Sequence, residues 1–225
     1  MTSTNCELKC DWATHEAAKY ACEHWHYSKC LPAGKSFKIG AWEDGQYIGV
    51  VIFSRGANNH IGTPYNLQQT ECVELTRIAL REHQHFVSEI MMAALRKLKE
   101  MNPGLRLIVS YADPMHGHVG AIYQATNWIY VGPAKIQNHW MINGRLVHKK
   151  TINALKPKGI TQSEFVYAHY RNALSVPVPG KHTYLMPLDR KMKKQLLPLA
   201  KPYPKKPNAD EAGDGSSQST AAVQH

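Results

Sequence analysis

Hydrophobic positions in the first quarter of the chain switch from helical to strand spacing. Residues 15–25 repeat apolar side chains at helical intervals, and Thr14 stands before them as an N-cap. Apolar runs follow at residues 37–42 and 47–54, with Asp44 and Gly45 between them as a hairpin signal. This part of the sequence predicts a helix followed by two antiparallel strands.

The middle of the chain alternates strand and helix patterns. Residues 70–80 have the pattern of a strand, and residues 87–101 that of an amphipathic helix. A β-branched run at 105–111, a short helix at 119–126 and a strand at 128–131 follow. Strands and helices in this order favour an α/β fold, with a mixed central sheet flanked by helices.

The last third of the chain is less regular. Asn143 and Gly144 predict a second hairpin, residues 181–188 a further strand, and Arg190 the start of a short basic helix. Beyond it, proline, serine and glycine replace the apolar residues. We therefore expect no regular structure near the carboxyl terminus.

These patterns divide the sequence into four segments. Its length is typical of one domain with extensions. Residues 1–12 are assigned as a lead-in, 13–150 as the catalytic domain, 151–207 as a basic extension, and 208–225 as a disordered tail. The basic extension is expected to complete the domain and to contact nucleic acid.

Charge adds a partner to this picture. The chain carries 27 lysines and arginines against 17 acidic residues, a net charge of +10, which indicates an acidic partner such as nucleic acid. The amino terminus lacks the pattern of a signal peptide, and no apolar run approaches the roughly 18 residues of a membrane span. The five cysteines, an odd number, favour reduced thiols. We expect a soluble cytoplasmic protein with no membrane partner.

The chain is organised around the stretch from Leu105 to Gly132. Its apolar run ends at Asp113, and a glycine-spaced loop with His116 and His118 follows. In open α/β sheets, ligands bind at the carboxyl ends of strands. We therefore place the active site here, although Asp113 also fits a turn residue that bonds its own backbone.

Three other positions carry candidate chemistry. His26 and Tyr27 lie where the first helix meets a polar loop, and such a pair can ligate a metal or relay protons. Their alternative is a surface histidine beside a packed tyrosine. Tyr123, within the short helix, is by itself typical of a core residue. His116 and His118 alone are a weak metal signal.

A second group of residues concerns phosphates. The junction at residues 79–88 joins a strand to a helix, with Arg77, Arg81 and Ser88 nearby, but it contains no glycine. This excludes a glycine-rich phosphate loop of the usual kind. Six cations of the basic carboxyl-terminal third are candidates for nucleic-acid binding: Lys149, Lys150, Arg190, Lys191, Lys193 and Lys194. The alternative for such a run is a solvated charged face.

Several short motifs, taken together and in order, resemble one family. They are His26-Tyr27-Ser28, Gly34-Lys35, Arg55-Gly56-Ala57-Asn58, Glu74-Leu75-Thr76-Arg77, Asn102-Pro103-Gly104-Leu105-Arg106, Ser110-Tyr111-Ala112-Asp113 and the run from Gly120 to Trp128. The chain resembles the bacteriophage Mom family of DNA adenine-modifying proteins, and its element order resembles the acetyltransferase-like (GNAT) fold.

The resemblance implies an enzyme that converts adenine in double-stranded DNA to N6-methylcarbamoyl-adenine inside the host bacterium. The modification blocks host restriction nucleases. By match to the family pattern, the metal or catalytic group is His26, Tyr27, Asp113 and Tyr123, with iron as the metal. Arg77 and Ser88 are implied on the donor side, and Arg81 is a nearby cation. The donor is acetyl-CoA or, because the glycine-rich loop is missing, an aminoacyl-tRNA.

An enzyme that modifies this amino group must take the base out of the duplex. The long loop 55–69, with Asn58 and Tyr65, has the polar and aromatic content to hold an extruded adenine. Two other functions stay open: a basic DNA-binding protein with a vestigial transferase fold, and an ordinary N-acetyltransferase. A homodimer is also left open.

Overall fold

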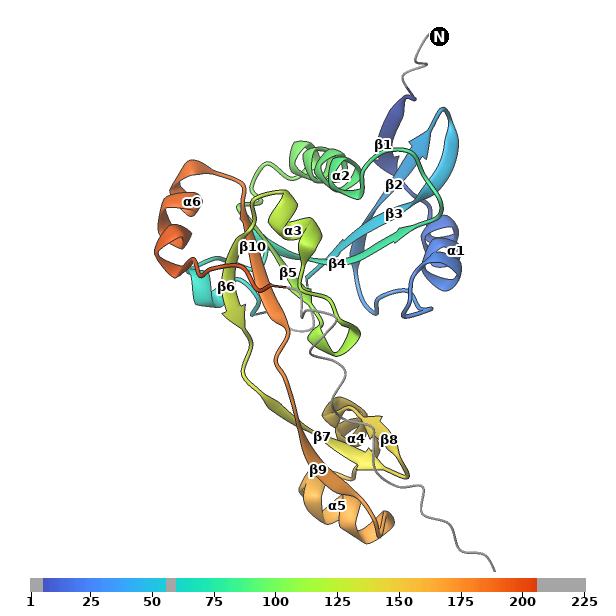
Figure 1. Ribbon diagram of the computed structural model, residues 1–225, viewed down its shortest axis with the longest axis vertical. Helices are drawn as coiled ribbons and strands as arrows, with labels where there is room; N and C mark the ends of the chain where they lie inside the picture. Colours follow the sequence, from blue (N-terminus) through green and yellow to red (C-terminus); the bar gives the residue numbers. More distant parts are fainter. Residues whose placement is uncertain (1–5, 56–59, 206–225) are drawn as a thin grey trace, which may run out of the picture.

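The computed structural model describes residues 6–55 and 60–205; Asn58 and the segment 208–225 lie outside these ranges. A seven-stranded sheet forms the body of the protein, and a three-stranded sheet projects from it (Figure 1). The expected mixed α/β sheet flanked by helices is confirmed. Among the helices in these ranges, none combines the length and apolar character needed to cross a membrane.

The amino-terminal elements are β1 (Leu8–Trp12), α1 (His15–Trp25), β2 (Ser36–Glu43) and β3 (Gln46–Ser54). The predicted cap of α1 is confirmed, since Thr14 Oγ1 accepts a hydrogen bond from the Ala17 amide at 3.1 Å. Asp44 and Gly45 both have positive φ, 46° and 79°, as a tight hairpin turn requires. The lead-in assigned to residues 1–12 is wrong, because β1 pairs with β2 as the edge strand of the sheet. Five alternating residues are too short a pattern to stand out in a sequence.

The remaining elements of the body are η1 (Thr63–Tyr65), β4 (Cys72–Leu80), α2 (Val87–Met101), β5 (Leu107–Ala112), η2 (Pro114–His116), α3 (Ala121–Ala125), β6 (Ile129–Pro133), β10 (His182–Pro187), α6 (Arg190–Leu196) and η3 (Leu197–Leu199). The strand order is β1-β2-β3-β4-β5-β10-β6. β4 and β5 run parallel, because α2 connects them, and the other neighbours are antiparallel.

Helices cover both faces of this sheet. Along β3, Val51 and Phe53 point to the cluster under α2, while Val50 and Ile52 point to the opposite face under α1. This alternation is the two-residue period of a strand that is buried on both sides. It explains why β3 shows a continuous apolar run in the sequence.

β4 and β5 pair over four residues only and then part. Residues 72–75 of β4 face residues 107–110 of β5, and β4 continues to Leu80 without this partner. The separation begins at a bulge: Leu75 pairs with Phe53 and Arg77 with Ile52, so Thr76 is the extra residue. A bulge bends a strand and changes the direction of its side chains. The opening between β4 and β5 is where the cleft described below lies.

Between β6 and β10 the chain leaves the body and forms a projection (residues 134–181), here called the arm. It contains β7 (Gln137–Ile142), β8 (Arg145–Val147), α4 (Lys149–Leu155), α5 (Gln162–His169) and β9 (Leu174–Val178). Trp140, Ile152 and Val166 belong to a core of its own. The predicted boundary at residue 150 is therefore wrong, because it separates the β7–β8 hairpin from the helices that pack on it. Pairing of β7 with β9, more than thirty residues later, leaves no local sequence signal.

Candidate active site

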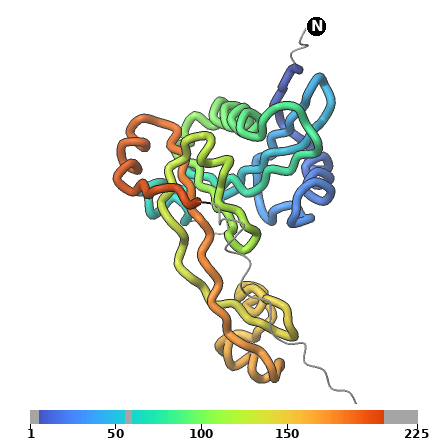
Figure 2. Tube along the Cα trace, viewed as in Figure 1, coloured from blue at the N-terminus to red at the C-terminus, as the bar shows by residue number. Residues whose placement is uncertain are grey.

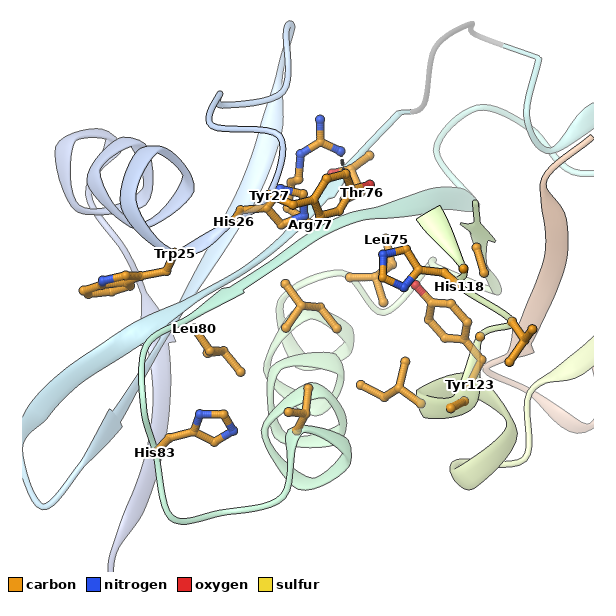
Figure 3. A pocket seen from close by; sticks show the side chains of 18 residues that line it. Trp25, His26, Tyr27, Leu75, Thr76, Arg77, Leu80, His83, His118 and Tyr123 are labelled. Atoms are coloured by element: carbon orange, nitrogen blue, oxygen red, sulfur yellow. Dashed lines mark hydrogen bonds between the residues drawn. The ribbon is translucent and has the colours of Figure 1, made fainter. Parts of the chain in front are cut away.

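A cleft of about 620 Å³ opens where β4 and β5 part (Figure 3). Its walls come from four places in the chain: the end of α1, the second half of β4, the start of α2, and the segment from the end of β5 to α3. Lining residues used below are Trp25, His26, Tyr27, Arg77, His83, Val87, His118 and Tyr123. A volume of this size is typical of pockets that bind small molecules or cofactors.

His26 is the C-cap of α1 and is 8% exposed. Its Nδ1 lies 3.1 Å from the Ser28 amide nitrogen and 2.8 Å from Ser28 Oγ. Because a backbone amide can only donate, Nδ1 is the acceptor and the ring proton of the neutral form is on Nε2. Burial lowers the pKa of His26 to about 4, with a further contribution from the Arg77 cation. His26 is thus a neutral hydrogen-bond donor at neutral pH.

Tyr27 brings the α1 side of the cleft into contact with the loop after β5. Its ring is 57% exposed, and its centroid lies 4.3 Å from that of His26. On the other side it lies 5.1 Å from His116 and 5.7 Å from His118. The structure therefore groups one phenol with three imidazoles, from two segments about 90 residues apart in the sequence.

Tyr123 approaches the cleft from α3. Its hydroxyl oxygen lies 2.7 Å from Ser110 Oγ of β5, and its ring packs between Trp128 and Tyr184. Burial raises the pKa of Tyr123, and the hydrogen bond with Ser110 opposes this only in part. The side chain is therefore a fixed, neutral phenol that lines the cleft.

Asp113 directly follows β5, at the strand end where it was predicted, but its carboxylate does not line the cleft. One oxygen accepts from the Met115 amide at 3.1 Å, and the other lies 3.0 Å from Lys181 Nζ. Burial raises the pKa of Asp113, but the Lys181 ammonium, together with the Met115 amide and His116, outweighs burial and holds the pKa below its usual range. Asp113 thus joins the histidine loop to Lys181, at the end of the arm. Its bond with the Met115 amide is the turn geometry that the sequence also allowed for this residue.

Comparison with known proteins places the chain in a family. The model of the Mom protein family matches residues 7–205. The chain belongs to the Mom protein family. A curated relative, the methylcarbamoylase mom of Escherichia phage Mu, is 25% identical over 187 residues, which cover 80% of this chain and 76% of that protein.

Solved structures similar to this Mom family chain include a putative acetyltransferase, an AHL synthase and an acyl-CoA N-acyltransferase. A putative acetyltransferase from Acinetobacter baylyi has a TM-score of 0.44 at 12% identity and covers 84% of this chain and 96% of its own. The AHL synthase LasI has a TM-score of 0.42 at 11% identity, with coverage of 86% and 96%. An acyl-CoA N-acyltransferase from Pseudomonas aeruginosa has a TM-score of 0.38 at 14% identity, with coverage of 59% and 90%.

The four residues expected to hold iron in this Mom family chain do not fit one metal site. Both Asp113 oxygens are engaged outside the cleft, and the His26 lone pair that a metal would need faces Ser28. Over residues 6–55 and 60–205, the one cluster of three histidine, cysteine or acidic ligand atoms within 4.8 Å is Cys6, Glu43 and His85, none of which lines the cleft.

The residues expected on the donor side are separated. Arg77 lines the cleft, and its buried Nε has no hydrogen-bond partner among the described residues. Ser88 does not line the cleft, and Arg81 Nη2 instead donates to Gln46 at 3.1 Å beside a different depression. Arg81 and Ser88 therefore do not share the cleft with Arg77, because β4 ends at Leu80 and Ser88 lies one residue beyond the start of α2. Their place on the donor side stays a prediction.

The loop between β4 and α2 binds a carboxylate at the strand-to-helix junction where backbone amides could otherwise bind a phosphate. The buried Glu43 accepts hydrogen bonds from the amides of Gln84 and His85 at 2.8 to 3.0 Å. These amides are the donors that a diphosphate would need at such a junction. With them already paired, this loop does not fit the diphosphate of CoA.

The candidate nucleic-acid contacts fall in three places. Tyr65 packs with the cluster between α6 and the sheet and does not line the cleft, so its contact with an extruded base stays a prediction. Lys149 and Lys150 begin α4 in the arm, with Lys150 exposed. The four cations of α6, Arg190, Lys191, Lys193 and Lys194, are exposed on the body, away from the arm (Figure 1).

Sequence reasoning missed His83 and Trp25 as lining residues, whereas it placed the active site at the loop that carries His118. A signal for His118 was present, because Gly117 and Gly120 on either side of it both have positive φ, 68° and 77°. Glycines in this conformation mark a loop whose backbone path is fixed. No comparable signal points to His83 or Trp25, which reach the cleft only through tertiary packing.

The pKa of His26 leads to a prediction about stability. Its folded value of about 4 lies below the ordinary 6.5, so folding favours the neutral ring and stability falls as pH drops from 6.5 towards 4. Between pH 7 and pH 5 the wild type should lose about 2 kcal/mol that a His26→Gln variant does not lose. Chemical denaturation of both proteins at the two pH values measures this difference. Equal losses would show that His26 titrates normally.

Proposed function

We propose that this chain transfers a methylcarbamoyl group to the N6 amino group of adenine in double-stranded DNA, and so protects phage DNA from host restriction nucleases. The observation that carries the proposal is the cleft between β4 and β5, which is lined by His26, Tyr27, His118 and Tyr123. Membership of the Mom family and the name of the phage Mu relative support the same chemistry.

The lining of the cleft suits an extruded base. The N6 amino group lies inside the duplex, so the target adenine must leave the base stack before it can react. Aromatic rings hold such a base by stacking, and Tyr27 is an exposed ring at the cleft. The rings of Trp25 and Tyr123 line the same space. An adenine stacked on Tyr27 would place its amino group among the groups that carry the chemistry.

The transfer itself requires one proton to leave and one to arrive. N6 forms a bond to the transferred carbon, the bond from that carbon to its carrier breaks with the electron pair on the carrier, and the amino group gives up a proton. We assign His118, on the exposed loop, to accept that proton. Tyr123, kept neutral by burial, donates a proton to the departing carrier. His26 Nε2–H is a hydrogen-bond donor that orients the reactants.

The donor side of the cleft bears on the carrier of the transferred group. Arg77 supplies one cation there, while the amides of the β4–α2 loop are bonded to Glu43. This arrangement favours a carrier that does not seat a diphosphate at the loop over one that does, such as CoA.

Nucleoside mass spectrometry tests the proposed function. Plasmid DNA from bacterial cells expressing the chain is digested to nucleosides and compared with DNA from cells carrying the empty vector. We expect a deoxyadenosine heavier by one methylcarbamoyl substituent in the first sample only. Unmodified deoxyadenosine from cells with abundant folded protein would contradict the proposal. An acetyl-sized increase would instead indicate an ordinary acetyltransferase.

A further inference from the structure

Most of the net positive charge of the protein lies in the arm. Residues 134–181 contain eight lysines and arginines against one acidic residue, Glu164, which is a net charge of +7 out of the chain's +10. The arm holds about a fifth of the sequence, so the rest of the chain is close to neutral for its size. Charge segregated in this way is typical of a surface that binds a polyanion.

Several cations of the arm are exposed to solvent and can contact a partner. Arg145, Lys150, Lys158 and Arg171 are exposed. Among the described residues, the ion pairs involve one arm cation, Lys181, which pairs with Asp113 at the base of the arm. Cations that stabilised the fold would be expected to face carboxylates. Because these exposed cations face no carboxylate in the described part of the chain, they are available to a partner outside the protein.

The arm is held by the body next to the active site. At its base the two strands leave and return side by side, with the Ala134 amide donating to the Lys181 carbonyl at 2.9 Å. Lys181 then pairs with Asp113, at the start of the loop that carries His118. Figures 1 and 2 show the arm projecting from the edge of the body at which this loop lies. A polymer bound along the arm would pass the mouth of the cleft.

We propose that the arm is the DNA-docking element of this protein, binding the phosphates of a duplex beside the base that enters the cleft. The choice of double-stranded DNA as the polyanion rests on the proposed function. A second copy of the chain is a poorer partner, because two surfaces of net charge +7 repel each other. Structured RNA has the same phosphate chemistry and is separated from DNA by the test below.

Two variants with the same charge and composition test the location of binding. The arm variant replaces Arg145, Lys149, Lys150 and Lys158 by glutamine. The control variant replaces the four α6 cations, Arg190, Lys191, Lys193 and Lys194, by glutamine. Each removes one arginine and three lysines from the full chain, so both have the same net charge. Thermal unfolding checks that both remain folded.

Binding to a 30-base-pair duplex is measured by fluorescence anisotropy over a range of salt concentrations, without any donor. We expect the arm variant to bind about 100-fold more weakly at ~0.1 M salt, with its log–log salt slope smaller by about 3, since each phosphate contact contributes ~0.9. The α6 variant should lose less than about fivefold. Equal losses in the two variants would overturn the proposal, because net charge alone would then explain binding.

The same titration with an RNA hairpin separates the two kinds of nucleic acid. A variant that loses RNA binding but keeps DNA binding would overturn the proposal in favour of RNA docking. These results do not depend on catalysis, since no transfer occurs in the assay. The binding assay can therefore contradict DNA docking on the arm while mass spectrometry still shows adenine modification. It can equally support docking on the arm when no modification is found.

Discussion

Replacement of Tyr123 by phenylalanine is expected to lower the rate of adenine modification about 100-fold, the usual effect of losing a positioned proton donor. The substitution removes only the hydroxyl group of Tyr123. Its ring stays between Trp128 and Tyr184, so the fold is expected to lose no more than about 1 kcal/mol with the hydrogen bond to Ser110. The amount of modified deoxyadenosine formed per unit time measures the effect.

Tyr130 offers a matched control for this substitution. It belongs to the same core cluster as Tyr123, stacks on the same Tyr184, and its hydroxyl has a single partner in the described residues, His182 Nδ1 at 2.8 Å. Its side chain does not line the cleft. A Tyr130→Phe variant should therefore retain activity within about threefold. If both variants lose activity alike, Tyr123 serves the packing of the core and not the reaction.

The second large effect is expected at His118. Conversion of His118 to glutamine removes the group assigned to take the N6 proton, and we expect a loss of about 100-fold in modification rate. His118 is exposed, so the substitution should leave the free energy of unfolding within about 0.5 kcal/mol of the wild type. Glutamine keeps polar atoms at the position but cannot accept and release a proton at neutral pH.

His116 provides the comparison. It lies two residues away on the same exposed loop and contacts the same Tyr27 ring, but it does not line the cleft. A His116→Gln variant should stay within about fivefold of the wild type. Equal losses at His116 and His118 would assign both histidines to the positioning of Tyr27. Equal retention would remove proton transfer from this loop.

Local patterns predicted the body of the fold well. α1 and α2 begin and end at the predicted residues, because each has a continuous apolar stripe and, for α1, a capping threonine. The hairpin at Asp44 and Gly45 was equally visible, since few residues adopt its backbone angles. The patterns that failed were β1, which is short, and the arm, whose sheet joins strands distant in the sequence.

Prediction of the site was less complete for a related reason. The end of β5 was correctly placed at Asp113, but a sequence does not show which way a side chain at a strand end turns. The Lys181 ammonium, 68 residues later in the chain, draws the carboxylate away from the cleft. His26, Tyr27 and Tyr123 were carried by the family resemblance and do line one cleft. Their function there stays a prediction.

One measurement tests most directly whether adenine modification takes place in the cleft between β4 and β5. Nucleoside mass spectrometry is applied in parallel to DNA from cells that express the wild type, the Tyr123→Phe and His118→Gln variants, and the Tyr130→Phe and His116→Gln controls. The account predicts a heavier deoxyadenosine in the wild type and both controls, and only traces in the two cleft variants. Wild-type levels of product in both cleft variants would contradict it.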